Sequence, residues 1–338
     1  MGKRILEIED LRVSFDTYAG EVQAVRGVSL YVDEGEVLAI VGESGCGKSV
    51  TAQTIMKLNA MPPARIVSGS IVLDEQDIVK ASGNEMRKIR GNKVAMIFQD
   101  PMTCMNPTKQ VGKQIVEAIK LHKHLSNAEA REQAIMCLEQ VNIPNPKERA
   151  KQYPHEYSGG MRQRAMIAMA ISCDPKLLIA DEPTTALDVT IQAQIMDLLV
   201  EIKEKQNTAI ILITHDLGVV AGIANRVAVM YAGMIVETGT THQIFYDHTH
   251  PYTNALMRSL PSVDANKTTD LVSIPGTPPD LLAPPVGCPF AARCKHCMEI
   301  CKEEMPPEFQ LEQEGHVARC WLLHPDCPSA AERGDFSE

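Results

Sequence analysis

The stretch Gly42-Glu-Ser-Gly-Cys-Gly-Lys-Ser49 decides the fold of this chain. An apolar, β-branched run at 36–41 precedes it and helix-forming residues follow it, which predicts a strand, a glycine-rich loop and a helix in that order. The glycines let successive backbone N–H groups point at a phosphate, and the N-terminus of the helix adds partial positive charge. We therefore expect Lys48 to reach the β- and γ-phosphates of a nucleotide and the Ser49 hydroxyl to bind Mg²⁺.

An acidic pair follows a second apolar run. Residues 177–180 have the composition of a buried strand, and Asp181 stands where that strand should end. In phosphate-loop ATPases an acid at this place holds Mg²⁺. Glu182, the next residue, is placed to orient and deprotonate an attacking water, so the loop and the acidic pair together predict ATP hydrolysis.

A third segment, Ser158-Gly-Gly160, precedes a run of helix-forming residues and is called the signature below. Taken alone it is an ordinary helix cap, because serine is a favoured cap residue. Its backbone could also bind an anion in the way the phosphate loop does. The chain thus carries two candidate anion-binding helix N-termini but only one lysine-bearing loop.

Together these segments resemble the ATP-binding subunit of an ABC transporter, over about residues 5–245. The shared motifs, in the family's order, are the phosphate loop, Phe98-Gln-Asp-Pro101, the signature, Asp181-Glu182, Thr185-Ala-Leu-Asp188 and Thr214-His-Asp216. The resemblance implies an α/β fold with a RecA-like phosphate-loop NTPase core and an antiparallel β subdomain. A helical subdomain at about 101–165 would touch the membrane subunits. It also implies two such subunits packed head to tail, so that the phosphate loop of one and the signature of the other sandwich one ATP.

The same resemblance implies individual roles in that composite site. Glu182 is the catalytic base, Gln99 senses Mg²⁺ and the lytic water, and His215 orients the γ-phosphate and that water. Mg²⁺ is held by Ser49 and Gln99. The remaining implied nucleotide and interface residues are Gly42, Ser44, Gly45, Cys46, Gly47, Lys48, Val50, Asp181, Ser158, Gly159, Gly160 and Asp188.

Two further points concern the same motifs. Tyr18 is favoured as the residue that stacks on adenine, from its place before the first glycine of the loop, and Phe15 is the alternative. Met161 stands where the commonest form of the signature has Gln. The Ser-Gly-Gly core is intact, so we expect activity to be retained.

Composition indicates a cytosolic chain. The 338 residues are 44% apolar and carry a formal net charge of −10. No stretch approaches the ~18–20 apolar residues that span a bilayer, and the N-terminus lacks the apolar core of a signal peptide. The acidity argues against nucleic acid or anionic membrane as a partner. A transporter subunit of this composition must reach the cytoplasmic face of the cell membrane, as a peripheral protein, through protein partners.

The spacing of apolar and polar residues predicts how the chain is organised. Alternation of apolar and polar residues at 1–35 indicates a small antiparallel sheet. Strands of a parallel sheet are expected at 177–180, 210–214 and 227–231, and an amphipathic helix at 185–205. We expect an ATPase domain at 1–260 and a cysteine-rich C-terminal extension at 261–338.

The last third resembles the tail of the oligopeptide and dipeptide importer ATPases, a group that also includes nickel importers. The resemblance rests on residues 250–261, a proline-rich stretch at 275–285 and the cysteine-rich tail. It implies an ATPase that energises uptake of di- or oligopeptides. Its partners would be two membrane-spanning permease subunits, a sibling ATP-binding subunit and an extracytoplasmic substrate-binding protein, with no nucleic acid.

Two other functions stay open. Nickel or another small substrate within the same importer group is the nearer one. A soluble ABC ATPase acting on ribosomes or DNA is the second, but that class usually carries two cassettes in one chain or a long coiled-coil insertion, and neither is present in this sequence.

Six of the ten cysteines lie from Cys288 onward. Clustered cysteines in a cytosolic chain favour a metal over disulfides. The importer tail resembled here can carry a [4Fe–4S] cluster on cysteines that correspond to Cys288, Cys294, Cys301 and Cys320. Four thiolates also suit Zn²⁺, a metal-free tail is the third possibility, and Cys297 and Cys327 are spare. We expect a structural role for the metal, because the tail lies outside every segment that handles nucleotide.

Overall fold

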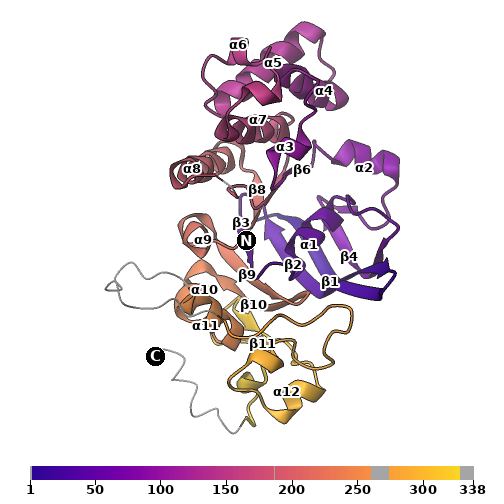
Figure 1. Cartoon of the computed structure of the whole chain (residues 1–338), viewed down its shortest axis with the longest axis vertical. Coiled ribbons are helices and arrows are strands. Elements are labelled where there is room, and N and C mark those ends of the chain that lie inside the picture. The colour runs from indigo at the N-terminus through magenta and orange to yellow at the C-terminus, as the bar shows by residue number, and fades with distance from the viewer. Residues whose placement is uncertain (1, 186, 260–273, 328–338) are drawn as a thin grey trace.

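The computed structural model describes residues 2–185, 187–259 and 274–327 of the 338-residue chain (Figure 1). These residues form an elongated molecule. A group of helices stands at one end, two sheets occupy the middle and the C-terminal tail covers the other end (Figure 1). The fold is α/β, as predicted.

A four-stranded antiparallel sheet, in the order β2-β1-β4-β5, takes up the N-terminal region. Its strands are β1 (Arg4–Thr17), β2 (Gly20–Asp33), β4 (Ala64–Leu73) and β5 (Gln76–Asp77). Because side chains alternate between the two faces of a strand, Leu6 and Ile8 of β1 are buried in the core, and after a register shift Leu11 and Val13 are buried in the same way. The small antiparallel sheet predicted for residues 1–35 is confirmed, and two later strands extend it.

An eight-stranded sheet, in the order β11-β12-β10-β9-β3-β8-β7-β6, forms the centre of the molecule. Its parallel strands are β3 (Val37–Val41), β6 (Val94–Ile97), β7 (Leu177–Asp181), β8 (Ala209–Ile213) and β9 (Arg226–Tyr231). Every residue of β3, β7 and β8 is buried, which explains why these strands are apolar throughout except for Asp181 at the end of β7. Parallel strands end at one common edge, so the loop after β3 and the acids at the end of β7 lie at the same edge.

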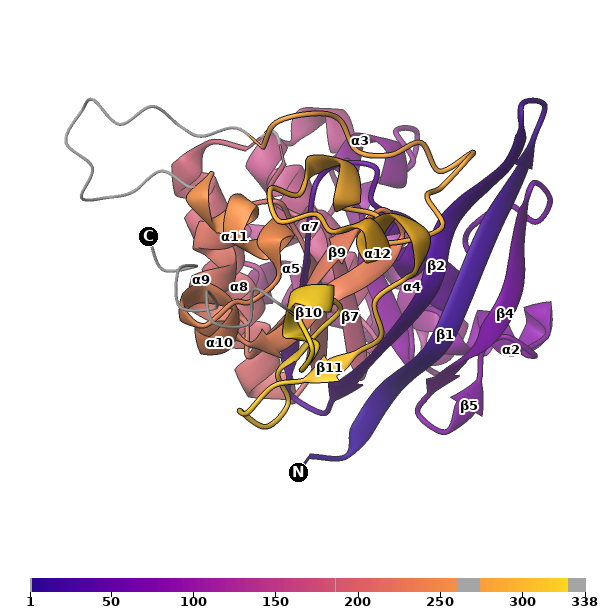
Figure 2. The same ribbon diagram turned by 90° about the horizontal axis from the view of Figure 1, so that it is seen from below.

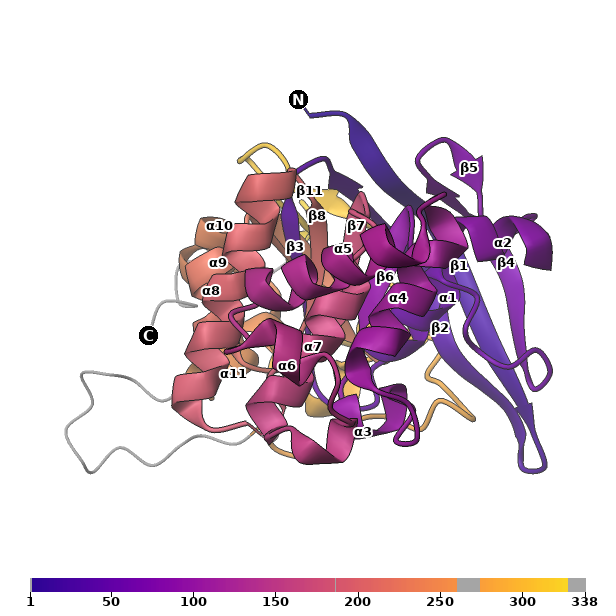
Figure 3. The ribbon, with the colours of Figure 1, turned by 90° about the horizontal axis from the view of Figure 1, so that it is seen from above.

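Helices form the far end of the molecule, seen from above in Figure 3. They are α3 (Pro101–Cys104), α4 (Val111–His122), α5 (Asn127–Gln140), α6 (Pro146–Arg149) and α7 (Gly159–Ile171), with a 3₁₀ turn at Pro154–Glu156. Their apolar faces share a core that includes Ile115, Leu138 and Ile167. These helices lie in the region 101–165 for which helices were predicted, and α7 continues a few residues further.

The other helices lie around the sheets. They are α1 (Lys48–Ile55), α2 (Gly83–Ile89), α8 (Val189–Gln206) and α9 (Leu217–Ile223). The helix predicted from residue 185 begins instead at Val189, because the Asp188 side chain accepts a hydrogen bond from the Ile191 N–H and caps the helix there.

The C-terminal tail continues the central sheet. β10 (Met234–Thr240) pairs antiparallel with β12 (Val317–Ala318), which pairs with β11 (Phe309–Gln310). Figure 2 shows this end of the molecule from below, with the short helices α10 (Thr241–Tyr246), α11 (Pro251–Arg258) and α12 (Glu299–Glu303). Further 3₁₀ turns occupy Ala291–Arg293 and Trp321–Leu323. The predicted domain boundary after residue 260 falls at residues 260–273, outside the described part, and stays a prediction.

Within the described ranges, no helix combines the length and the apolarity needed to cross a membrane.

Candidate active site

The phosphate loop connects β3 to α1 and can be built only with glycine at two places. Gly42 has φ +150°, and a Cβ there would lie 2.1 Å from the Met230 carbonyl oxygen. Gly47 has φ +102°, and its Cβ would lie 2.5 Å from the carbonyl oxygen of Ala24. A side chain at either position would push the loop away from the sheet, so the two glycines fix where a phosphate can bind.

Lys48 is buried and its ammonium rests on the loop itself. Nζ donates to the carbonyl oxygens of Gly42 at 2.8 Å and Glu43 at 2.9 Å. The Cys46 sulfur lies 3.7 Å from the same nitrogen, and burial raises the pKa of that thiol. The lysine is therefore already held over the loop where its predicted role requires it.

Ser49, in the first turn of α1, and Asp181, at the end of β7, come together beside the phosphate loop. The Ser49 hydroxyl donates to Asp181 Oδ1 at 2.9 Å. Burial raises the pKa of the Asp181 carboxyl, and the bond from Ser49 counteracts this in part. A hydroxyl and a carboxylate side by side are hard oxygen ligands of the kind that Mg²⁺ takes.

The Glu182 carboxylate is where the predicted catalytic residues meet. Its Oε2 accepts hydrogen bonds from Gln99 Nε2 at 2.8 Å and from Thr185 Oγ1 at 2.9 Å. His215 Nδ1 lies 3.6 Å from Oε1. The structure thus brings Glu182, Gln99 and His215 together as the sequence predicted. Thr185 as a ligand of this carboxylate was missed, although its place three residues after Glu182 in a tight turn was a signal for it.

These residues surround an open cavity of about 680 Å³. Its wall includes Gly45, Ser49, Gln99, Glu182 and His215. Phe15 of β1 also lines it. Tyr18, which was favoured as the adenine-stacking residue, is fully exposed at the hairpin turn between β1 and β2 and is not part of the wall. The geometry favours the alternative, Phe15, because three residues along a twisted hairpin carry the chain beyond the cavity.

Comparisons with known proteins agree with this geometry. A family model for the ABC transporter matches residues 25–185, and one for the oligopeptide/dipeptide transporter C-terminal region matches residues 236–301. The chain is 56% identical over 325 residues to the oligopeptide transport ATP-binding protein OppD of Bacillus subtilis, covering 96% of this chain and 90% of that protein. It is 53% identical to the dipeptide transport ATP-binding protein DppD of the same organism, covering 99% and 100% of the two chains.

The chain belongs to the ATP-binding proteins of the oligopeptide/dipeptide ABC transporters.

Solved structures place the fold of this ABC protein in the same class. A dimeric bacterial ABC transporter cassette, MJ0796, superposes with a TM-score of 0.63 at 26% identity, covering 70% of this chain and 99% of that one. The structure of cbiO1 from Clostridium perfringens, part of the ABC transporter complex cbiONQ, gives a TM-score of 0.61 at 28% identity, with 72% and 91% covered. The predicted phosphate-loop NTPase fold is confirmed.

The signature of this ABC protein lies away from its own phosphate loop. Ser158 caps α7, and its Oγ accepts a hydrogen bond from the Met161 N–H at 3.3 Å. Ser158 and Asp188 are exposed, and neither they nor Gly159 and Gly160 line the cavity. The structure therefore does not bring the signature together with Lys48 within one chain.

The C-terminal tail of this ABC protein reaches the nucleotide cavity, contrary to the expectation from sequence. Leu281 lines the cavity, and its carbonyl oxygen accepts a hydrogen bond from the Gln23 N–H at 2.9 Å. Arg293 binds the carboxylate of Glu43 inside the phosphate loop. These contacts join residues about 250 positions apart, so no local pattern could have shown them.

The tail cysteines form one group. Burial raises the pKa of Cys288 to about 12 and that of Cys294 to about 11, and neighbouring thiols add to both shifts. Burial also raises the pKa of Cys320, and the nearby thiols of Cys288, Cys294 and Cys301 raise it further by electrostatic repulsion. Cys297, expected to be spare, donates a hydrogen bond from its thiol to the Met298 carbonyl oxygen at 3.5 Å. In the described part of the chain, no three side chains of the His, Cys, Asp or Glu type are arranged to hold a metal ion.

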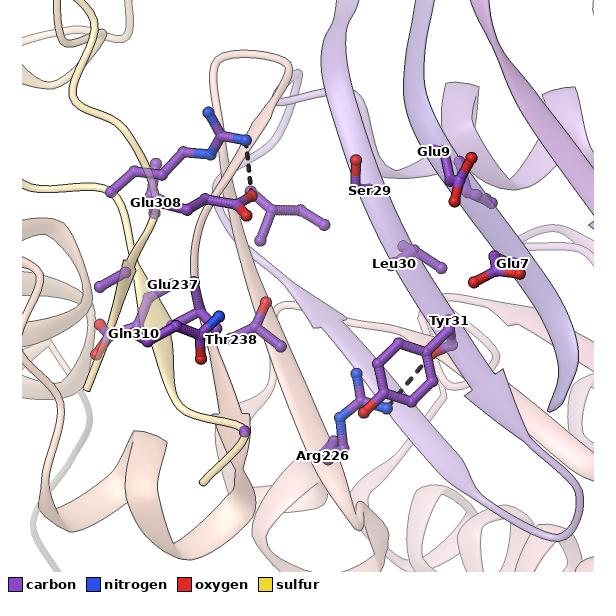
Figure 4. A pocket seen from close by; sticks show the side chains of 17 residues that line it. Glu7, Glu9, Ser29, Leu30, Tyr31, Arg226, Glu237, Thr238, Glu308 and Gln310 are labelled. Carbon is purple, nitrogen blue, oxygen red and sulfur yellow. Dashed lines mark hydrogen bonds and ion pairs between the residues drawn. The ribbon is translucent and has the colours of Figure 1, made fainter. Parts of the chain in front are cut away.

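A second cavity, of about 400 Å³, lies between the antiparallel sheet and the tail (Figure 4). Several of the charged side chains on its wall have a partner. Arg226 stacks on the Tyr31 ring with 3.9 Å from its guanidinium carbon to the ring centroid, and pairs with Glu36. Arg319 pairs with Glu308 at 2.7 Å. We assign no ligand to this cavity, since its two arginines are engaged within the chain.

Proposed function

We propose that this ABC ATPase hydrolyses ATP to drive the uptake of dipeptides or oligopeptides. The observation that carries the proposal is one chain with both a complete phosphate loop and a tail of the oligopeptide/dipeptide type. Relatives named for oligopeptide or dipeptide transport are more than half identical over at least nine tenths of this chain. Those names favour peptides over nickel or another small solute, and over a soluble ABC ATPase acting on ribosomes or DNA.

In the proposed reaction this chain binds the nucleotide and moves one proton. Lys48 and the N–H groups of residues 42–49 bind the phosphates of ATP. Ser49 and Gln99, beside Asp181, would hold Mg²⁺, which would neutralise charge on the phosphates. Glu182 accepts the proton of the attacking water, and the bonds from Gln99 and Thr185 hold its carboxylate in the orientation this requires.

The active unit in this proposal contains two ATP-binding chains. The exposed signature at 158–160 and Asp188 would face the nucleotide of a sibling ATP-binding subunit, since they do not line this chain's own cavity. The dimeric state named for the MJ0796 cassette supports this arrangement.

The partners follow from the same reading. The chain would lie at the cytoplasmic face of the cell membrane as a peripheral protein bound to two membrane-spanning permease subunits. An extracytoplasmic substrate-binding protein would deliver the peptide to these permeases. The helical region at 101–165 is the proposed contact with the permeases, and the net charge of −10 gives no reason to expect nucleic acid.

For the tail we propose a [4Fe–4S] cluster on Cys288, Cys294, Cys301 and Cys320, with Zn²⁺ as the alternative. These four thiols lie near enough to affect one another's pKa, and thiolates are the ligands that iron–sulfur clusters and zinc take. Their side chains would have to turn toward a common centre on metal binding, because no described group has a ligating arrangement as it stands. The cluster would supply a covalent tie within a segment that has a small apolar core of its own.

Reconstitution tests the proposed function. The chain, the sibling ATPase and the two permeases are purified as one complex, placed in lipid vesicles and supplied with a substrate-binding protein. We expect ATP-dependent accumulation of labelled dipeptide or oligopeptide, lost when Glu182 is replaced by Gln. If nickel alone stimulated ATP hydrolysis and no peptide were taken up, the transported substrate would be nickel or another small solute and not a peptide.

A further inference from the structure

Arg293, in the cysteine-rich tail, binds the phosphate loop through a two-pronged ion pair. Its Nη1 donates to Glu43 Oε2 at 2.6 Å and its Nη2 to Oε1 at 3.0 Å. The guanidinium also donates to the Tyr231 hydroxyl at 3.2 Å and to the carbonyl oxygens of Ile274 at 3.1 Å and Pro275 at 2.9 Å. These contacts give an acceptor to each of its five N–H groups, and the side chain is only 3% exposed.

Aromatic packing fixes the segment that carries Arg293. The Phe290 ring lies with its centroid 5.3 Å from that of Tyr231 and 5.4 Å from that of Tyr252, and the residue is 3% exposed. Cys288 and Cys294 pack against the same apolar cluster, which also contains Val41 at the end of β3. The tail is thus anchored to the strand that leads directly into the phosphate loop.

Glu43 is held at both its side chain and its backbone. While Arg293 binds the carboxylate, the Glu43 N–H donates to the Tyr252 hydroxyl at 2.9 Å. Its carbonyl oxygen in turn accepts from Lys48 Nζ at 2.9 Å. A chain of contacts therefore runs from Arg293 to Glu43 and from Glu43 to Lys48, over two steps of 3 Å or less.

We propose that Arg293 is a positioning residue of the ATP site. By fixing Glu43, it holds the loop and the ammonium of Lys48 where they meet the phosphates, so that nucleotide affinity depends on the tail. A two-pronged pair between charged groups restricts geometry more than a single contact does. An anchor that served only the tail would not change nucleotide affinity. The inference rests on the proposed role of the phosphate loop and is independent of which solute is transported.

Binding of a fluorescent ATP analogue to the full-length chain tests this. Arg293→Met keeps the apolar stem and removes the charge, and should weaken the affinity about tenfold. Arg293→Lys, which keeps the charge but only one prong, should lie between Arg293→Met and the parent chain. Glu43→Gln should cause a loss similar to that of Arg293→Met. The double variant should add little to either, because both substitutions remove one interaction.

Arg319→Met is the matched control, since Arg319 pairs with Glu308 within the tail and away from the nucleotide cavity. It should bind the analogue like the parent chain. In the assembled transporter, Arg293→Met should raise the KM for ATP about tenfold and leave kcat within about twofold.

Unchanged affinity in a folded Arg293→Met chain would overturn the inference. If thermal melting shows that Arg293→Met unfolds the tail, Glu43→Gln becomes the deciding variant, because it leaves the other acceptors of Arg293 in place. Unchanged nucleotide affinity in Glu43→Gln would also overturn the inference. Lys48→Ala separates the two levels of the argument. Full binding by Lys48→Ala would refute the phosphate-loop assignment itself, whereas loss there with no loss in Arg293→Met and Glu43→Gln refutes only the role of Arg293.

Discussion

The carboxylate of Glu182 accepts a hydrogen bond from the side-chain amide of Gln99 at 2.8 Å, across 83 residues of sequence. The two residues meet because β6 and β7 are neighbouring parallel strands and each residue follows the end of its strand. Glu182 itself has φ +47°, a left-handed conformation that turns its side chain toward Gln99 and His215. The carboxylate is therefore oriented by side chains of the same chain, as a general base should be.

Replacing Glu182 by Gln should abolish turnover while leaving ATP binding intact. The amide cannot accept the proton of water, whereas the phosphates are bound by Lys48 and the loop. Loss of a positioned base lowers the rate by about 10²–10⁴-fold. Hydrolysis by the purified complex and equilibrium binding of ATP measure the two properties separately. Near-normal hydrolysis in this variant would mean that another group is the base.

Thr185→Val offers a milder version of the same experiment. It removes the 2.9 Å bond to Glu182 Oε2 but keeps the volume and the bond from Gln99. We expect a fall in kcat of about tenfold with little change in ATP affinity, because one of two bonds that orient the base is lost. A larger effect on affinity than on kcat would instead place Thr185 in nucleotide binding.

Much of this site was accessible from sequence because its signals are local. The sequence shows a glycine-rich loop, apolar runs and acids directly after one of these runs, and these signals located Lys48, Asp181 and Glu182. The loop glycines are visible in sequence because the backbone there adopts a positive φ that favours glycine. The contact of Arg293 with Glu43 has no such signature. An arginine between two cysteines can point anywhere until packing of Phe290 on Tyr231 fixes it. The choice between Tyr18 and Phe15 has no local signal either, and the structure favours Phe15 because Phe15 lines the cavity whereas Tyr18 is exposed.

The two-chain reading predicts that this chain alone hydrolyses ATP slowly. Ser158 is exposed and does not line its own chain's cavity, and under the proposal it acts on nucleotide held by a partner. Adding the sibling ATPase and the permeases should raise the rate. Ser158→Arg should abolish that rise by filling the interface, without affecting ATP binding by the isolated chain. A high rate from a demonstrated monomer, independent of concentration, would contradict this reading.

The cluster proposal predicts the colour and the metal content of the tail. Anaerobic purification should give a brown protein with about four irons per chain. Cys301→Ser should remove the colour and loosen the tail to proteolysis. Cys297→Ser is the matched control and should do neither, because the Cys297 thiol bonds to the Met298 carbonyl oxygen and is not one of the four proposed ligands. Stoichiometric zinc without iron would replace the cluster by the zinc reading.

The buried group around Glu237 predicts how stability depends on pH. His250 is fully buried, and burial lowers its pKa from 6.5 to about 4. Its Nδ1 accepts the Tyr252 N–H at 3.0 Å, so the folded chain holds it neutral. The charged or titratable groups that face it are Glu237 and, through Glu237, His316, whose Nε2 lies 2.9 Å from Oε1. Burial opposes ionisation of Glu237, but hydrogen bonds from His316 and from the Thr249 N–H lower its pKa overall.

Between pH 6.5 and about 4 the unfolded chain therefore binds a proton at residue 250 that the folded chain does not. The free energy of unfolding should fall as the pH drops through this window, by up to about 1.4 kcal/mol per pH unit from this group. From about pH 4.5 downward Glu237 contributes in the same direction, since its lowered pKa means that its stabilisation is lost as it becomes protonated. His250→Asn keeps an acceptor for the Tyr252 N–H but cannot titrate. Its urea unfolding curves between pH 7 and pH 4 should show a slope smaller by up to that amount, whereas a slope equal to that of the parent chain would show that His250 does not stay neutral in the folded state.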